Sequence, residues 1–202
     1  MRIRPAGDSA LLLECPDRDR TEAWRAELWR RRAAGELAAT EIVAGERTVL
    51  LDGIADPDAV ARLVAEWSPA PAPSARLEPV DIPVRFDGTD LADVAALWRV
   101  PIPTAIDRLA NADLRVAFCG FAPGFGYLTG LPHEWAVPRL PSPRPRVPAG
   151  SVGLAAGYAG IYPTESPGGW RLVGRTDAVL FDVRRDPPAL LAPGTPVRLV
   201  PS

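Results

Sequence analysis

The sequence predicts an α+β protein of two domains, a small N-terminal α/β sandwich domain followed by a larger β-barrel or sandwich. Proline usage marks the division, because 21 of the 24 prolines follow residue 68. Residues 69–78 are rich in Pro and Ala, which is the composition of a polyproline-type linker. We therefore expect domains at 1–68 and 79–202.

The N-terminal part predicts the order strand, strand, helix, strand, strand, helix. Asp19 and Glu22 have capping-box spacing at the start of the first helix, and Asp56-Pro57 is an N-cap followed by proline at the first helical position. The apolar strand segments are Ser9–Leu13, Glu41–Val43 and Thr48–Leu51. These elements predict a small open sheet with both helices on one face. Because packing explains every patterned residue, we expect a scaffold or docking domain.

The second part begins with an alternating strand at Val80–Phe86. A helix capped by Thr89 and a second one near Thr104–Ala110 should follow. The remaining chain consists of short apolar segments separated by Gly and Pro, which is typical of a β-barrel or sandwich. We expect strands at Val116–Phe118, Ser151–Ala155, Trp170–Gly174, Val179–Val183 and Val197–Val200.

Composition excludes several functions. All 23 basic residues are arginine, so a Walker-A phosphate loop, Schiff-base chemistry and a biotin-carrying lysine are excluded. One His and two Cys cannot supply a typical His/Cys zinc site. A net charge of −2 argues against nucleic-acid binding. The two long uncharged stretches are each interrupted by Gly and Pro, which argues against a membrane span. Two distant cysteines and the lack of a signal-peptide core predict a cytoplasmic protein.

Nucleophilic catalysis has two weak candidates in the barrel part. Ala149-Gly-Ser-Val-Gly153 nearly matches a nucleophile elbow, but its only possible base is His133. Cys119 with His133 is the other pair, although Cys119 lies in an apolar strand, where a thiol is usually a small hydrophobic residue. The glycines of 118–132 do not fit the dinucleotide fingerprint. Glycines alternating with aromatic residues suit either a ligand pocket or barrel bends around aromatic core residues.

Three ordered motifs carry a resemblance that covers nearly the whole chain. They are Gly120-Phe-Ala-Pro-Gly-Phe-Gly-Tyr-Leu-Thr-Gly-Leu131, Val147-Pro-Ala-Gly-Ser-Val-Gly153, and Gly160-Ile-Tyr-Pro163 with Ser166-Pro-Gly-Gly-Trp170 and Gly174-Arg-Thr176. In these motifs the chain strongly resembles the B-subunit family of 5-oxoprolinase. The family is also called allophanate hydrolase subunit 1, and it includes a Kip-type inhibitor of a sporulation histidine kinase. From backbone chemistry alone, Ser166-Pro-Gly-Gly169 predicts a turn.

The resemblance implies a fold, partners and an activity. The C-terminal domain is expected to be a cyclophilin-like β-barrel that packs beside the related barrel of a second protein, the C-type subunit of the complex. Together with a third protein, the A-type subunit, such pairs look like an ATP-dependent lactamase that opens 5-oxoproline to glutamate. The phosphate loop that would bind ATP is missing here, so ATP is expected to be used by the complex. Alternatives are inhibition of a sensor histidine kinase, or a role as hydrolase or carboxyltransferase subunit that acts on allophanate or another urea-type amide.

The resemblance also suggests which residues bind a small amide or lactam. Arg146, Arg175, Ser151, Thr176 and the backbone amides of the Gly120–Gly126 loop would stabilise charge on the amide oxygen as binding groups, not as nucleophiles. The expected substrate-binding set, with no assigned catalytic residue and no metal, is Gly120, Phe121, Pro123, Gly124, Phe125, Tyr127, Arg146, Gly150, Ser151, Tyr162, Ser166, Gly168, Gly169, Trp170, Arg175 and Thr176.

Three residues, in two places, depart from the family pattern. Many relatives carry Gln-Thr where this chain has Tyr158-Ala159, and a His where it has Leu109. A tyrosine at 158 can substitute by stacking and by hydrogen bonding through its hydroxyl, whereas Leu109 cannot replace a His.

Overall fold

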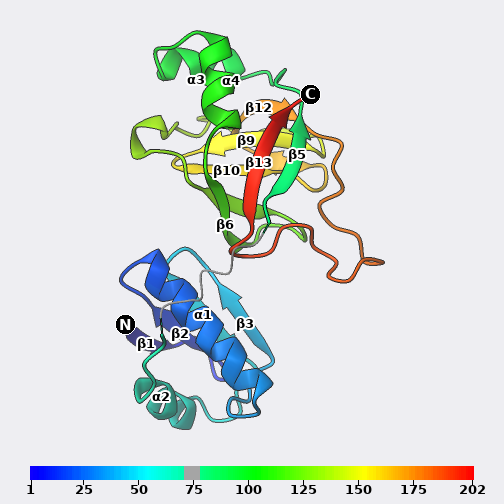
Figure 1. Ribbon diagram of the computed structural model, residues 1–202. Coiled ribbons are helices and arrows are strands. Elements are labelled where there is room, and N and C mark those ends of the chain that lie inside the picture. The colour runs from blue at the N-terminus through cyan, green and yellow to red at the C-terminus, as the bar shows by residue number, and fades with distance from the viewer. Residues whose placement is uncertain (71–77) are drawn as a thin grey trace. The chain divides into compact units, whose positions relative to one another are not determined.

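The computed structural model describes residues 1–70 and 78–202 and divides the chain into two units, Met1–Arg76 and Leu77–Ser202 (Figure 1). The division falls inside the predicted linker 69–78, most of which lies outside the described residues.

The N-terminal unit is a four-stranded antiparallel sheet with two helices. The sheet order is β1-β2-β4-β3. Side chains that alternate along the strands, such as Leu11 and Leu13, and Val49 and Leu51, form one buried face, and α1 and α2 contribute Trp24, Leu28 and Val64 to the same core. Both helices therefore pack against the same face of the sheet, as expected. The elements are β1 (Arg2–Pro5), β2 (Leu11–Glu14), α1 (Arg18–Ala33), β3 (Glu41–Ala44), β4 (Thr48–Asp52) and α2 (Pro57–Ala65).

The predicted cap of α1 is wrong by two residues. Asp17 is the N-cap, and its carboxylate accepts a hydrogen bond of 2.8 Å from the backbone N–H of Arg20. Asp19 lies within the first helical turn, where its charge complements the helix dipole. The second cap is confirmed, because Asp56 accepts from the backbone N–H of Ala59 at 2.9 Å.

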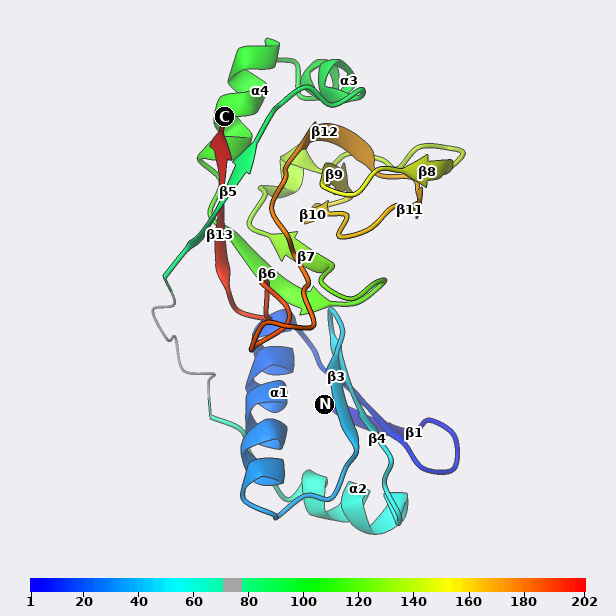
Figure 2. The same cartoon turned by 90° about the vertical axis from the view of Figure 1, so that its right-hand side faces the viewer.

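The C-terminal unit is a seven-stranded barrel-like sheet of order β12-β9-β10-β7-β6-β13-β5, with a two-stranded ribbon of β8 and β11 (Figure 2). A backbone bridge between Arg85 and Arg175, with both N–H···O distances at 2.9 Å, joins the two edges and closes the barrel. The cyclophilin-like barrel is confirmed. The elements are β5 (Val80–Val84), α3 (Leu91–Leu97), α4 (Ile102–Ala110), β6 (Leu114–Cys119), β7 (Gly126–Thr129), η1 (His133–Trp135), β8 (Arg144–Val147), β9 (Ser151–Ala155), β10 (Tyr158–Ile161), β11 (Ser166–Gly168), β12 (Arg171–Arg175) and β13 (Pro196–Pro201).

Three local predictions for this unit are wrong. Val179–Val183 forms no strand, and Val179 and Val183 are exposed. Ser166–Gly168 is not a turn but the edge strand β11, which pairs with β8. Pro167 is tolerated there because an edge strand has one side on which no backbone N–H is needed for pairing. The N-cap of α3 is Asp90, not Thr89. The Asp90 carboxylate does not cap the helix, because it is used in a contact with Arg144.

The helices α3 and α4 pack against each other and against β12 and β13. Their buried side chains join the barrel core, and Leu109 is completely buried there. In the part of the chain that the structure describes, no helix has the length and apolar character needed to cross a membrane.

Candidate functional site

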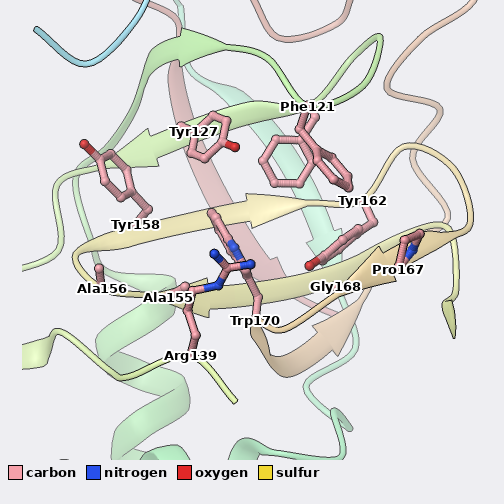
Figure 3. A pocket seen from close by; sticks show the side chains of 11 residues that line it. Phe121, Tyr127, Arg139, Ala155, Ala156, Tyr158, Tyr162, Pro167, Gly168 and Trp170 are labelled. Carbon is pink, nitrogen blue, oxygen red and sulfur yellow. The ribbon is translucent and has the colours of Figure 1, made fainter. Parts of the chain in front are cut away.

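An aromatic cavity of about 350 Å³ opens in the barrel unit between the loop that precedes β7, the β9–β10 turn and the β8–β11 ribbon (Figure 3). It is lined by Phe121, Phe125, Tyr127, Arg139, Ala155, Ala156, Tyr158, Tyr162, Pro167, Gly168 and Trp170.

The loop 120–125 presents an aromatic ring at the mouth of the cavity. Phe121 has a φ of 70°, which is uncommon for a bulky residue, and the residue is 58% exposed. The conformation is fixed by backbone hydrogen bonds from Ala122 to Gly120 and from Phe125 to Ala122. Gly124 is required, because its φ is 85° and a Cβ there would lie 2.8 Å from Cβ of Phe181. Such strain at an exposed aromatic residue is typical of a functional site.

Glycines beneath the cavity allow large rings to lie directly on the strands. Gly153 of β9 and Gly160 of β10 are cross-strand partners. A Cβ on Gly160 would lie 2.8 Å from Cζ of Phe125 and 2.9 Å from Cζ3 of Trp170, and one on Gly168 would collide with the Tyr162 hydroxyl. The glycines of the sequence motifs therefore make room for the rings that form the cavity.

The rings pack edge to face, which fixes their orientation. Phe125 contacts Tyr162 and Trp170 with centroid distances of 5.5 Å and interplanar angles of 79° and 86°. Tyr127 contacts Trp170 at 5.7 Å. Such pairs contribute about 0.5–1.5 kcal/mol beyond their burial. The cavity is therefore a preformed aromatic surface with little freedom to collapse.

The polar side chains of the cavity are phenols, the indole of Trp170 and one guanidinium. Burial raises the pKa of Tyr162, so its phenol remains a neutral hydrogen-bonding group at physiological pH. Arg139 is the cation among the lining residues, and these residues include no carboxylate. None of the described lining residues is Ser, Thr, Cys, His, Asp, Glu or Lys, so the cavity is equipped to bind and orient a ligand.

The structure brings together part of the expected substrate-binding set. Six of these residues line the cavity: Phe121, Phe125, Tyr127, Tyr162, Gly168 and Trp170. Gly120, Pro123 and Gly124 belong to the loop that carries Phe121. Gly169 accepts a backbone hydrogen bond from Leu140, and the Ser166 hydroxyl donates to the carbonyl of Thr164.

The expected cations Arg146 and Arg175 lie elsewhere. Arg146 is exposed and pairs with Glu165 at 3.1 Å. Arg175 pairs with Asp87 at 2.7 Å and lines a separate hollow together with Ser151. Gly150 and Thr176 belong to the same region: the N–H of Thr176 donates to the carbonyl of Gly150, and its hydroxyl accepts from the backbone of Ala178.

Neither candidate for nucleophilic catalysis reaches the cavity. The Cys119 thiol donates to the carbonyl of Leu191 at 3.5 Å, and His133 is exposed on η1. Ser151 is buried in β9 and lines the separate hollow instead.

Sequence reasoning missed Arg139, Ala155, Ala156 and Pro167, and it treated Tyr158 only as a departure from the family pattern. Arg139 lies in an irregular segment with no periodicity, so the sequence contains no signal that separates it from other arginines. Tyr158 lines the cavity with its ring edge-on to Tyr127, whereas the neighbouring Ala159 is buried.

Comparison with known families assigns this barrel and its aromatic cavity to a domain of the carboxyltransferase type. The family described as "Carboxyltransferase domain, subdomain C and D" matches residues 1–191. The chain belongs to this family, in the group formed by the B subunits of 5-oxoprolinase. The resemblance found in the sequence is thereby confirmed.

Several relatives support this assignment. The 5-oxoprolinase B subunit of Escherichia coli O157:H7 is 42% identical over 71% of this chain and 67% of its own length. The protein of the same name from Haemophilus influenzae is 35% identical over 99% and 97%. The crystal structure of TTHA0988 matches 96% of this chain at 30% identity and a TM-score of 0.80, and this chain spans 40% of that protein. The urea amidolyase of K. lactis shares the fold with a TM-score of 0.75 at 21% identity, over 15% of its length.

Proposed function

We propose that this chain is the substrate-binding subunit of a heteromeric, ATP-dependent 5-oxoprolinase, which opens 5-oxoproline to glutamate. The observation that supports the proposal most directly is the preformed aromatic cavity. Its volume and its apolar walls suit a small ring, and its phenols and backbone groups suit the polar edge of an amide.

The lining residues suit binding and not bond cleavage. Opening the lactam adds water and breaks the C–N bond, which requires a base or an activated nucleophile. Because the side chains of the lining offer phenols, an indole and a guanidinium but no carboxylate, imidazole or thiol, we assign the activation of the lactam to groups of the A-type or C-type partner. This chain would hold the ring and exclude water from it.

The cavity does not fit ATP. A triphosphate is usually held by several cations and by backbone N–H groups at a glycine-rich loop before a helix. The cavity contains one guanidinium, and the glycines of loop 120–125 precede the strand β7. We therefore propose that ATP binds to a partner in the complex. We place the complex in the cytoplasm, where free thiols such as those of Cys15 and Cys119 stay reduced.

Glutamate release from 5-oxoproline tests the proposal. The A-type and C-type proteins of the same organism are assayed with ATP, with and without this chain, and release is expected only when all three are present. Trp170→Ala should lower turnover strongly, because it removes a wall of the cavity. The control Trp29→Ala, an exposed ring of the N-terminal unit, should retain turnover.

Two outcomes would contradict the proposal. A stable complex with the C-type protein but no turnover would favour another amide, such as allophanate. Neither turnover nor a complex would favour a regulatory protein that binds a histidine kinase.

A further inference from the structure

Arg139 is held at the cavity by the backbone on both sides of it. Val137 exchanges two hydrogen bonds with Ala156 of the β9–β10 turn, at 3.0 and 2.7 Å. The carbonyl of Pro138 accepts from Nε of Arg171 at 3.1 Å, and the N–H of Leu140 donates to the carbonyl of Gly169 at 2.8 Å. The residues before and after Arg139 are thus fixed to the barrel, and this fixes the position of the Arg139 backbone beside the cavity.

Neither an ion pair nor a side-chain hydrogen bond links the guanidinium of Arg139 to another residue within 1–70 and 78–202. The residue is exposed, and its charge acts on the Tyr162 phenol, whose pKa it lowers against the larger effect of burial. Figure 3 shows the guanidinium directed into the space bounded by the aromatic rings. The neighbouring arginines differ. Arg144 pairs with Asp90 at 2.7 Å, Arg146 with Glu165 at 3.1 Å, and Arg171 with Asp93 at 3.1 Å.

A guanidinium placed this way selects a particular ligand chemistry. Its N–H groups match a carboxylate in a bidentate geometry, and a carboxylate entering an apolar cavity needs such a partner to offset its desolvation. The lining residues offer no second cation and no carboxylate that would compete for the guanidinium. The aromatic walls meanwhile accept a flat or small-ring body.

We propose that Arg139 binds the carboxylate of the ligand and determines the specificity of the cavity for small-ring or planar carboxylates over neutral amides. This inference rests on the proposed function, because 5-oxoproline carries a carboxylate on its lactam ring. Arg139 takes the place of Arg146 and Arg175, the cations expected from the sequence.

The test compares charged and neutral ligands of the same shape. Calorimetric titrations of the full chain would use L-5-oxoproline against its neutral carboxamide, and benzoate against benzamide. Arg139→Ala should weaken binding of both acids by about 10- to 100-fold, the loss expected for a charge-assisted hydrogen bond, and should change binding of the neutral amides by less than about twofold. Arg139→Lys should give intermediate affinity for the acids, because an ammonium cannot bind bidentately.

Arg146→Ala is the matched control, since it removes an exposed arginine from the neighbouring strand, and it should bind all four ligands like the wild type. Unchanged thermal unfolding of Arg139→Ala would show that the fold is intact. Equal affinity of Arg139→Ala and wild type for the acids would overturn the inference, as would an equal loss for acids and amides, or failure of the wild type to bind any acid.

Failure of the proposed function gives a different pattern. If benzoate binds in an Arg139-dependent way and 5-oxoproline does not bind, the carboxylate site stands and the lactam substrate is refuted. If 5-oxoproline binds equally well with and without the arginine and the complex still releases glutamate, the function stands and the role of Arg139 is refuted.

Discussion

Replacing Gly160 with alanine tests whether the aromatic rings rest directly on the strands. The new methyl group would lie 2.8 Å from Cζ of Phe125 and 2.9 Å from Cζ3 of Trp170, whereas ordinary contacts begin at 3.4 Å. Both rings must therefore move by about half an ångström within a packed cluster. Such overpacking costs about 1–3 kcal/mol, so we expect Gly160→Ala to lower the free energy of unfolding by about 2 kcal/mol.

Urea denaturation followed by tryptophan fluorescence measures this loss. For the barrel unit, about 2 kcal/mol corresponds to a midpoint lowered by about 1 M urea. Gly157→Ala is the matched control three residues earlier, because no atom lies within 4 Å of its new methyl group and its φ is outside the left-handed region. We expect the control to raise the free energy of unfolding by about 0.4–1 kcal/mol, because alanine restricts the unfolded chain more than glycine does. Equal midpoints for the two variants would refute the packing argument.

Three further predictions concern other contacts. Asp90→Asn should cost about 2 kcal/mol in urea unfolding, because it leaves the half-buried Arg144 without its charge partner, whereas the exposed Asp93→Asn should cost less than about 0.5 kcal/mol. Hydrogen bonds from two arginines lower the pKa of Glu27 from 4.5 to about 2. Because the pKa of Glu27 is lower in the folded than in the unfolded protein, its ion pairs stabilise the fold fully above pH 4.5, and this stabilisation is lost as the pH falls toward 2. Between pH 4.5 and pH 2, the free energy of unfolding of the wild type should fall by about 1 kcal/mol more than that of Glu27→Gln. If the free energies of unfolding of the two proteins fell in parallel with pH, the prediction would be wrong. Phe121→Gly removes the strain of a φ of 70°, so it should change the free energy of unfolding by less than about 1 kcal/mol. It should also weaken the binding of 5-oxoproline measured by calorimetry, and an unchanged affinity would exclude this ring from the site.

Local chemistry accounts for most elements that the sequence predicts correctly. The cap at Asp56 and the strands predicted at Glu41–Val43 and Thr48–Leu51 depend on neighbouring residues, and the structure contains all three as the N-cap of α2, β3 and β4. The predictions are wrong where contacts with residues far away in the sequence determine the local structure. Ser166–Gly168 has turn residues but pairs with β8. Val179–Val183 has strand residues, but its pairing is limited to an isolated bridge between Phe181 and Ala189, and Val179 and Val183 are exposed.

The aromatic part of the candidate site could be expected from the motifs, and its charged part could not. Phe125, Tyr162 and Trp170 lie in glycine-rich motifs whose small residues make room for rings. Arg139 and Arg146 look alike in sequence, since both directly follow a proline. Only the ion pair of Arg146 with Glu165 and the hydrogen bonds on both sides of Arg139 distinguish them.

Proline usage and local periodicity predicted the two-part organisation and a β-barrel or sandwich. The three ordered motifs carried the resemblance to the family, which implied the barrel and the aromatic character of the site. The tertiary structure decided which of these residues meet. Closure of the barrel through the Arg85–Arg175 bridge places the predicted cation Arg175 at a separate hollow, beside Asp87. The β9–β10 turn fixes Val137 and thereby sets Arg139 at the cavity. Such pairings join residues far apart in the chain, and their energies depend on geometry that no local pattern encodes.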